Sequence, residues 1–175
     1  MSYLLYSICI IAVIVIDQIT KMLAVKYLMP IHTHPLLENV FHLTYVENKG
    51  AAFGILQNHR WVFMIISTIV MAVIVFVMFK YKKFLHPIIM IGLSFTVGGG
   101  IGNMIDRTIK GFVVDFFDFT LIDFAVFNVA DTFICIGVGL IFLDVLLGKS
   151  DYSFLDGEKQ ILDSEKDNKD ETYTD

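Results

Sequence analysis

Four long apolar runs, separated by polar stretches, set the pattern of this chain. They cover residues 4–28, 61–79, 84–105 and 127–147. A helix needs about 20 residues, at 1.5 Å of rise each, to cross the ~30 Å hydrocarbon core of a bilayer. The pattern therefore predicts an all-α polytopic membrane protein with four transmembrane helices.

The polar stretch 30–60 cannot span a membrane, because it holds two prolines and four histidines. Its segment Asn39–Val46 (NVFHLTYV) is rich in β-branched and aromatic residues, which favour strands. We expect a small β-cradle over about residues 30–60, lying on the outer membrane surface. His32 and His34 are interpreted as a solvated loop pair and not as a metal site, because no cysteine or acidic cluster accompanies them.

The connection between the last two runs, residues 108–127, is also too charged and broken to span. We expect it to lie outside the membrane as a partly amphipathic segment with a short helix. It carries Asp115. Its other carboxylates, Asp118 and Asp123, are expected to be solvated or interfacial.

Composition agrees with a membrane protein, since 56% of the 175 residues are hydrophobic and the mean hydropathy is +0.70. By count, residues 1–147 carry nine Lys/Arg and nine Asp/Glu, whereas residues 148–175 carry four Lys and nine Asp/Glu. The acidic excess therefore lies in the tail, and no surface is basic enough for nucleic acid. We expect a four-helix membrane domain over residues 1–148 and an acidic, disordered cytoplasmic tail, without catalytic role, over residues 149–175.

The loop after the second run carries Lys80, Lys82 and Lys83, the most basic short loop in the chain. The positive-inside rule places it in the cytoplasm, so both termini are expected to be cytoplasmic and residues 30–60 external. With four spans, most of the polar residues within or beside the apolar runs then fall at the outer face. These residues are Asp17, Lys21, Asn48, Asn103, Arg107, Asp115, Asn128 and Asp131.

Two of the carboxylates, Asp115 (VVDFF) and Asp131 (NVADTF), stand in apolar surroundings. A carboxylate there is costly unless it has a partner or a function. We expect the two to face each other and share a proton, which suits attack of water on an amide. Which member holds the proton is left undecided, because a coupled pair titrates jointly.

Other polar and small residues give expectations that the fold can test. Asp17 and Lys21 are four apart and can pair, either as a structural ion pair or as a contact to the site or to lipid. Asn103, Asp106 and Arg107 are expected to share one helix face, as are Asn128 and Asp131. The G-x-x-x-G pair Gly98 and Gly102 permits close helix packing or leaves room for a ligand. The two cysteines, Cys9 and Cys135, are interpreted as small core residues.

Five motifs of this chain resemble those of the lipoprotein signal peptidases, also called signal peptidase II. They are DQITK (17–21), ENKGAAFGI (47–55), GGGIGNMIDR (98–107), GFVVDFFDF (111–119) and FNVADTFI (127–134). The resemblance implies four transmembrane helices, an extracytoplasmic β-cradle and a catalytic pair at Asp115 and Asp131. It further implies support of the site by Asp17, Lys21 and Asp106. It implies a site lined by Asn48, Gly50, Gly99, Asn103, Arg107, Val113, Asn128 and Ala130.

The resemblance also implies a substrate: a bacterial prolipoprotein cleaved on the N-terminal side of a diacylglyceryl-modified lipobox cysteine. It implies an enzyme of the bacterial cytoplasmic membrane that needs no metal or other cofactor, acts as a monomer and is inhibited by the cyclic peptide globomycin. The competing readings are a proton- or cation-coupled carrier, a metal-dependent membrane phosphotransferase and a purely structural membrane protein. The sequence disfavours a carrier, because it shows no repeat and its polar groups gather at one face. Apolar neighbours of the two aspartates disfavour a cation cluster.

Overall fold

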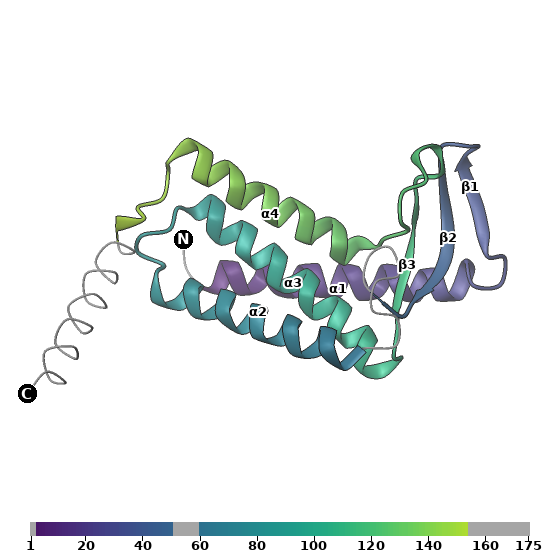
Figure 1. Cartoon of the computed structure of the whole chain (residues 1–175), viewed down its shortest axis with the longest axis horizontal. Coiled ribbons are helices and arrows are strands. Elements are labelled where there is room, and N and C mark those ends of the chain that lie inside the picture. Colours follow the sequence, from purple (N-terminus) through teal and green to yellow (C-terminus); the bar gives the residue numbers. More distant parts are fainter. Residues whose placement is uncertain (1–2, 51–59, 154–175) are drawn as a thin grey trace, which may run out of the picture.

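The computed structural model describes residues 3–50 and 60–153. Its four α-helices lie side by side and alternate in direction along the chain, with a small sheet at one end (Figure 1). Their bounds are Tyr3–Tyr27 (α1), Arg60–Lys80 (α2), Pro87–Ile109 (α3) and Val129–Leu147 (α4). Each falls within a few residues of a predicted apolar run.

Three of these helices, α1, α3 and α4, are long and apolar enough to cross a membrane. In α2, the stretch Met64–Lys80 counts as a shorter apolar helix. Large apolar side chains are exposed along α1, α2 and α4, for example Ile11, Ile69 and Phe142, which are 58–62% exposed. Such apolar surfaces suit a lipid environment and not water.

Helix α3 is the central helix, and it packs against α1, α2 and α4. Glycines allow its close approach to α4. A Cβ on Gly92 would lie 2.6 Å from the carbonyl oxygen of Gly137, and one on Gly99 would lie 2.5 Å from that of Ala130. Of the two readings of the glycine pair, the structure supports packing, because Gly98 and Gly102 face Val13 and Asp17 of α1.

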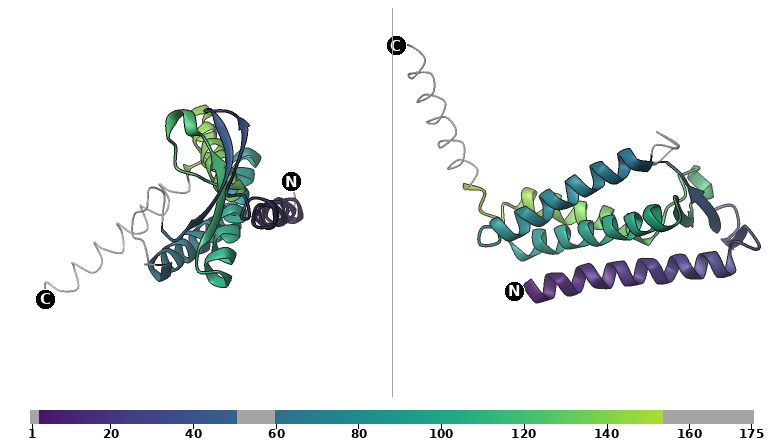
Figure 2. Two further views of the ribbon diagram at one scale, coloured as in Figure 1. Left: turned by 90° about the vertical axis from the view of Figure 1, so that its right-hand side faces the viewer. Right: turned by 90° about the horizontal axis from the view of Figure 1, so that it is seen from below.

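The sheet has three antiparallel strands in the order β1-β2-β3. Strands β1 (Thr33–Leu37) and β2 (Phe41–Asn48) lie in the predicted cradle, and residues 51–59 of that cradle lie outside the described residues. The right-hand view of Figure 2 shows the sheet at the same end of the helices as in Figure 1. The sheet is therefore built from two segments far apart in sequence, because its third strand comes from the connection before α4.

The expectation of a short helix in that connection was largely wrong. It forms strand β3 (Val113–Asp118) and then a single 3-10 turn, η2 (Thr120–Ile122). β-branched and aromatic residues dominate β3, which suits a strand that packs on a core. Pairing with β2, with Val46 opposite Asp115, completes the strand.

Asp144 lies at the opposite end of the helices, in the last turn of α4. It is fully buried. The chain after α4 folds back toward the α2–α3 loop, where the Asp151 amide donates to the Phe84 carbonyl (2.9 Å). The Tyr152 hydroxyl donates to Asp144 Oδ2 (3.1 Å), so the segment that covers this carboxylate also binds it. Residues 154–175, most of the predicted tail, lie outside the described residues.

Candidate active site

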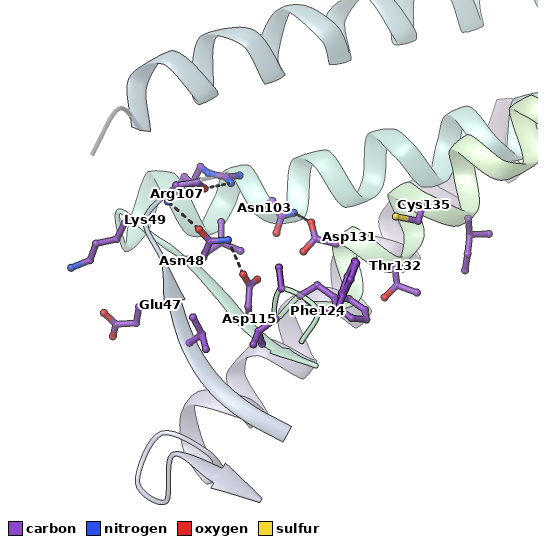
Figure 3. Close-up of a pocket in the computed structure, with 17 residues that line it drawn as sticks. Glu47, Asn48, Lys49, Asn103, Arg107, Asp115, Phe124, Asp131, Thr132 and Cys135 are labelled. Carbon is purple, nitrogen blue, oxygen red and sulfur yellow. Dashed lines mark hydrogen bonds between the residues drawn. The ribbon is translucent and has the colours of Figure 1, made fainter. Parts of the chain in front are cut away.

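A cavity of about 890 Å³ lies where β2, β3 and the outer ends of α3 and α4 meet (Figure 3). Both aspartates singled out from the sequence face it. Its lining residues are Val46, Glu47, Asn48, Lys49, Gly50, Asn103, Arg107, Val113, Asp115, Phe124, Ala125, Val126, Phe127, Asp131, Thr132, Cys135 and Ile136.

Asp115 stands in the middle of β3 and is 1% exposed. Two side-chain amides hold its two oxygens. Asn48 Nδ2 donates to Oδ2 (2.9 Å) from the neighbouring strand β2. Asn128 Nδ2 donates to Oδ1 (2.6 Å) from the residue before α4. The carboxyl group is thereby fixed in orientation at the cavity wall.

Asp131 lies in the first turn of α4, where the helix begins with a capping box. Asn128 is the N-cap, and its side chain accepts the Asp131 amide (3.0 Å). In return, the Asn128 amide donates to Asp131 Oδ2 (3.2 Å). A capping box satisfies amides that the helix leaves unpaired, and a carboxylate is favoured at this end of a helix. The predicted sharing of one helix face by Asn128 and Asp131 is realised through this cap.

Asn103 of α3 connects the two carboxyl groups. Its Nδ2 donates to Asp131 Oδ1 (2.8 Å), and its Oδ1 accepts from Asn128 Nδ2 (3.1 Å). Because Asn128 also donates to Asp115, a continuous chain of hydrogen bonds runs from one aspartate to the other. The structure therefore places both aspartates at one cavity, and the sharing of a proton between them stays a prediction.

The protonation of Asp115 is set by opposing effects. The net result is a pKa raised to about 6: burial is the largest cause and the nearby charge of Asp131 adds to it, while hydrogen bonds from Asn48 and Asn128 and the charge of Lys21 oppose the rise. A carboxyl group with such a pKa exchanges its proton near neutral pH, as acid–base chemistry requires.

Asn48, Gly50 and Arg107 form the outer wall of the cavity. The Gly50 amide donates to Asn48 Oδ1 (3.0 Å), which turns the Asn48 Nδ2 toward Asp115. Arg107 Nη2 donates to the Gly50 carbonyl (3.4 Å) from α3. The cationic side chain of Arg107 therefore lines the same cavity as Asp115 and Asp131.

Asp17 and Lys21 do form the expected ion pair, with 2.9 Å between Lys21 Nζ and Asp17 Oδ2. Asp106 does not share the cavity face with Asn103 and Arg107, because it is fully buried and 3.6 Å from Lys21 Nζ. The outward Lys110 also pairs with Asp106 (2.9 Å). These charges lie behind the cavity wall.

Three residues expected to line the site lie behind its surface. Asn128 and Ala130 are fully buried, and Gly99 packs against the Ala130 carbonyl. None of the three is among the cavity-lining residues in the described part of the chain.

Sequence reasoning missed one wall of the cavity, formed by Thr132, Cys135 and Ile136 of α4 and by Phe124–Phe127. The reading of Cys135 as a core residue was wrong, since its side chain is exposed. The spacing of four residues between Asp131 and Cys135 puts both on one face of the helix, and this is the signal that could have placed Cys135 at the cavity.

Comparison with known proteins is consistent with this arrangement. A lipoprotein signal peptidase of Brevibacillus brevis is 50% identical over 147 residues, 84% of this chain and 93% of the relative. One of Clostridioides difficile is 41% identical over 147 residues, 84% of this chain and 98% of the relative. A solved bacterial membrane enzyme shares the fold with a TM-score of 0.75 and 31% identity, covering 85% of this chain and 91% of its own.

The family model described as signal peptidase (SPase) II matches residues 9–147. This range contains the four helices almost entirely, the three strands and every residue of the hydrogen-bond chain between the two aspartates. On this match and on the two relatives, the chain belongs to the signal peptidase II family.

Proposed function

We propose that the chain is an aspartic endopeptidase that removes signal peptides from bacterial prolipoproteins. It would cleave on the N-terminal side of the diacylglyceryl-modified lipobox cysteine. The observation that carries this proposal is the pair Asp115 and Asp131, which face one cavity and are joined through Asn103 and Asn128. Family membership supports the same substrate class.

The charges around the site support a pair that carries one proton. Behind the wall, Lys21 lies beside Asp17 and Lys110 beside Asp106, so each carboxylate there has a cation. Arg107 then balances one negative charge on the catalytic pair. A second negative charge would be uncompensated in a buried site, which favours retention of one proton.

In the proposed reaction, the ionised member of the pair takes a proton from water as the water attacks the scissile carbonyl carbon. The neutral member donates its proton to the carbonyl oxygen, giving a neutral tetrahedral intermediate. Collapse of this intermediate breaks the C–N bond: the proton taken from water passes to the leaving amine, and one hydroxyl of the intermediate returns its proton to the other aspartate, which restores a pair with one proton. Asn48 and Arg107 would bind the substrate backbone and stabilise developing charge, with Gly50 and Val113 beside that backbone.

The site lies at one end of the apolar helices, beside the sheet (Figure 1). A lipid-modified substrate keeps its acyl chains in the bilayer, which would hold the scissile bond at this depth. Positioning of this kind lowers the entropy cost of reaching the reactive geometry. Membrane lipid is therefore a partner of the reaction, whereas no cofactor takes part in the proposed steps.

We place the protein in the cytoplasmic membrane with four spans, both termini inside and the cavity outside. The 21 residues of α2 give a length of about 31 Å, enough for a fourth span. Lys80 ends α2, and Lys82 and Lys83 follow it, at the end opposite the cavity, as the positive-inside rule requires. A reporter fused after Lys83 should be cytoplasmic and one inserted near His34 external, and the reverse pattern would refute this topology.

Cleavage by the purified protein tests the function directly. One prolipoprotein would be offered with and without its diacylglyceryl group, and the new N-terminus of the product would be sequenced. Cleavage before the modified cysteine, unaffected by a chelator and absent without the lipid, is the expected result. Cleavage of both forms would refute the role of the lipid, and cleavage of neither by folded protein would refute the function. Inhibition by globomycin and activity of a monomer in detergent are further expectations from family membership.

A further inference from the structure

A fully buried charge cluster joins α1 and α3 behind the cavity. Lys21 Nζ lies 2.9 Å from Asp17 Oδ2 and 3.6 Å from Asp106 Oδ2. All three side chains have no exposed surface. Burial of charges is costly even when they are paired, so a buried cluster of this kind is weak support for stability alone.

Each of the two carboxylates also holds one backbone amide. Asp17 Oδ1 accepts the Ala130 amide (3.0 Å), and Asp106 Oδ2 accepts the Val114 amide (3.0 Å). Ala130 directly precedes Asp131, and Val114 directly precedes Asp115. Lys21 therefore contacts both carboxylates that hold the backbone next to the site: that of Asp17 beside Asp131 and that of Asp106 beside Asp115.

Lys21 makes a third contact that reaches the pair through a side chain. Its Nζ donates to Asn103 Oδ1 (2.8 Å). An asparagine amide has its acceptor on one side and its donors on the other, so this contact turns Nδ2 away from the lysine. That Nδ2 donates to Asp131 Oδ1 (2.8 Å). Lys21 thus orients the Asn103 side-chain amide so that its Nδ2 donor is directed at Asp131.

The interface between α1 and α3 is shaped to hold Asp17 in this place. A Cβ on Gly102 would lie 2.5 Å from Asp17 Oδ2, so the glycine leaves the space that the carboxylate fills. Gln18 Nε2 donates both to Asp17 Oδ2 (3.1 Å) and to the Gly102 carbonyl (3.1 Å). The carboxylate has little freedom to move away from the Ala130 amide.

We propose that Lys21 is a positioning residue that fixes the separation and orientation of Asp115 and Asp131. It acts through Asp17 on α4, through Asp106 on β3 and through Asn103 on the Asp131 carboxyl group. The inference rests on the proposed function and deepens it. The alternative role is charge compensation alone, in which any arrangement of equal net charge would serve.

A charge-balanced double variant separates the two roles. Lys21→Met with Asp17→Asn removes one cation and one anion and leaves Asp106 paired with Lys110. Compensation alone predicts an unchanged kcat. Positioning predicts that kcat falls about 100-fold, as for a catalytic group displaced by about 1 Å, while KM stays within about threefold. Lys110→Met is the matched control, since it removes a contact to Asp106 without touching Asp17 or Asn103, and it should keep kcat within about threefold.

A distance measurement tests the same inference without using activity. Spin labels would be placed at native Cys135 of α4 and at Glu47→Cys of β2, in a Cys9→Ser background. Glu47 pairs with Val114, so it reports the position of β3. The distance distribution should broaden or shift when Lys21 and Asp17 are replaced.

The charge-retaining variant Lys21→Arg provides a second test of the inference if the double variant does not fold. Its planar guanidinium cannot reproduce the three contacts of a compact ammonium group. We expect a cooperative unfolding transition with kcat lowered at least about 10-fold. An unchanged kcat together with an unchanged distance distribution, in whichever of the two variants folds, would overturn the inference. A parent protein that cleaves no prolipoprotein would instead refute the proposed function, and the distance measurement would still decide the positioning role.

Discussion

Replacement of Gly99 by alanine should separate the two helices that carry the site. The added Cβ would lie 2.5 Å from the Ala130 carbonyl oxygen and 2.8 Å from Ile134 Cγ1. The first distance is about 0.9 Å short of ordinary van der Waals contact, and the atom approached is backbone. Helix α4 must therefore move by several tenths of an ångström or more at the residue that precedes Asp131.

The size of the effect follows from that displacement. Overpacking of a close interface costs about 1–3 kcal/mol, so the thermal midpoint in detergent should fall. A displacement approaching 1 Å at a catalytic group costs about 100-fold in rate, so kcat for the lipid-modified prolipoprotein should fall by one to two orders of magnitude. Cleavage would be followed by the appearance of the shortened product.

Gly139→Ala is the matched control, because a Cβ at Gly139 of α4, the helix that Gly99 approaches, would have nothing within 4 Å. It should cleave at the parent rate, with an unchanged or slightly higher midpoint, since alanine favours a helix. A Gly99→Ala protein with the parent rate and midpoint would refute the reasoning, and so would an equal loss in both variants.

Three further predictions follow from the contacts. Asn48→Ala removes a hydrogen bond that lowers the pKa of Asp115, so the limb of the pH–rate profile that reports Asp115 should move upward, by about 1 pH unit. A downward move of that limb would contradict this. Asn128→Ala removes the N-cap of α4 and a donor to Asp115. The free energy of unfolding from circular dichroism melts should fall by about 1 kcal/mol, and kcat should fall as well. Unchanged stability together with an unchanged kcat would count against the capping role. Tyr152→Phe removes the donor to buried Asp144 at the far end, so the free energy of unfolding should fall by about 1.5–3 kcal/mol while the cleavage rate stays constant; a lost rate would show unexpected coupling to the site.

The helices and the aspartate pair could be predicted from the sequence for clear physical reasons. A lipid-facing helix is apolar along its whole length, so length and composition reveal it without knowledge of its neighbours. A carboxylate in such surroundings is costly, so Asp115 and Asp131 stand out even before a fold is known. The ion pair of Asp17 and Lys21 follows from local spacing on one helix.

What escaped the sequence depends on contacts between distant segments. Strand β3 forms because β2 pairs with it, and the residues 113–118 alone do not reveal that partner. The exposure of Cys135 depends on which face of α4 the cavity occupies. Asp144 is buried because Tyr152 returns to it, a contact that an acidic, polar segment gives no local reason to expect.

The central claim is that Asp115 and Asp131 together perform the hydrolysis. The direct test is the single-turnover cleavage of a diacylglyceryl-modified prolipoprotein by purified Asp115→Asn and Asp131→Asn proteins, with melts that confirm folding. Asp123→Asn is the control, because Asp123 is an exposed residue directly after η2 and is not itself among the residues that line the cavity in the described part of the chain. Both catalytic variants should lose cleavage to background while the control keeps the parent rate. Substantial cleavage by either folded variant would contradict the assignment of the pair.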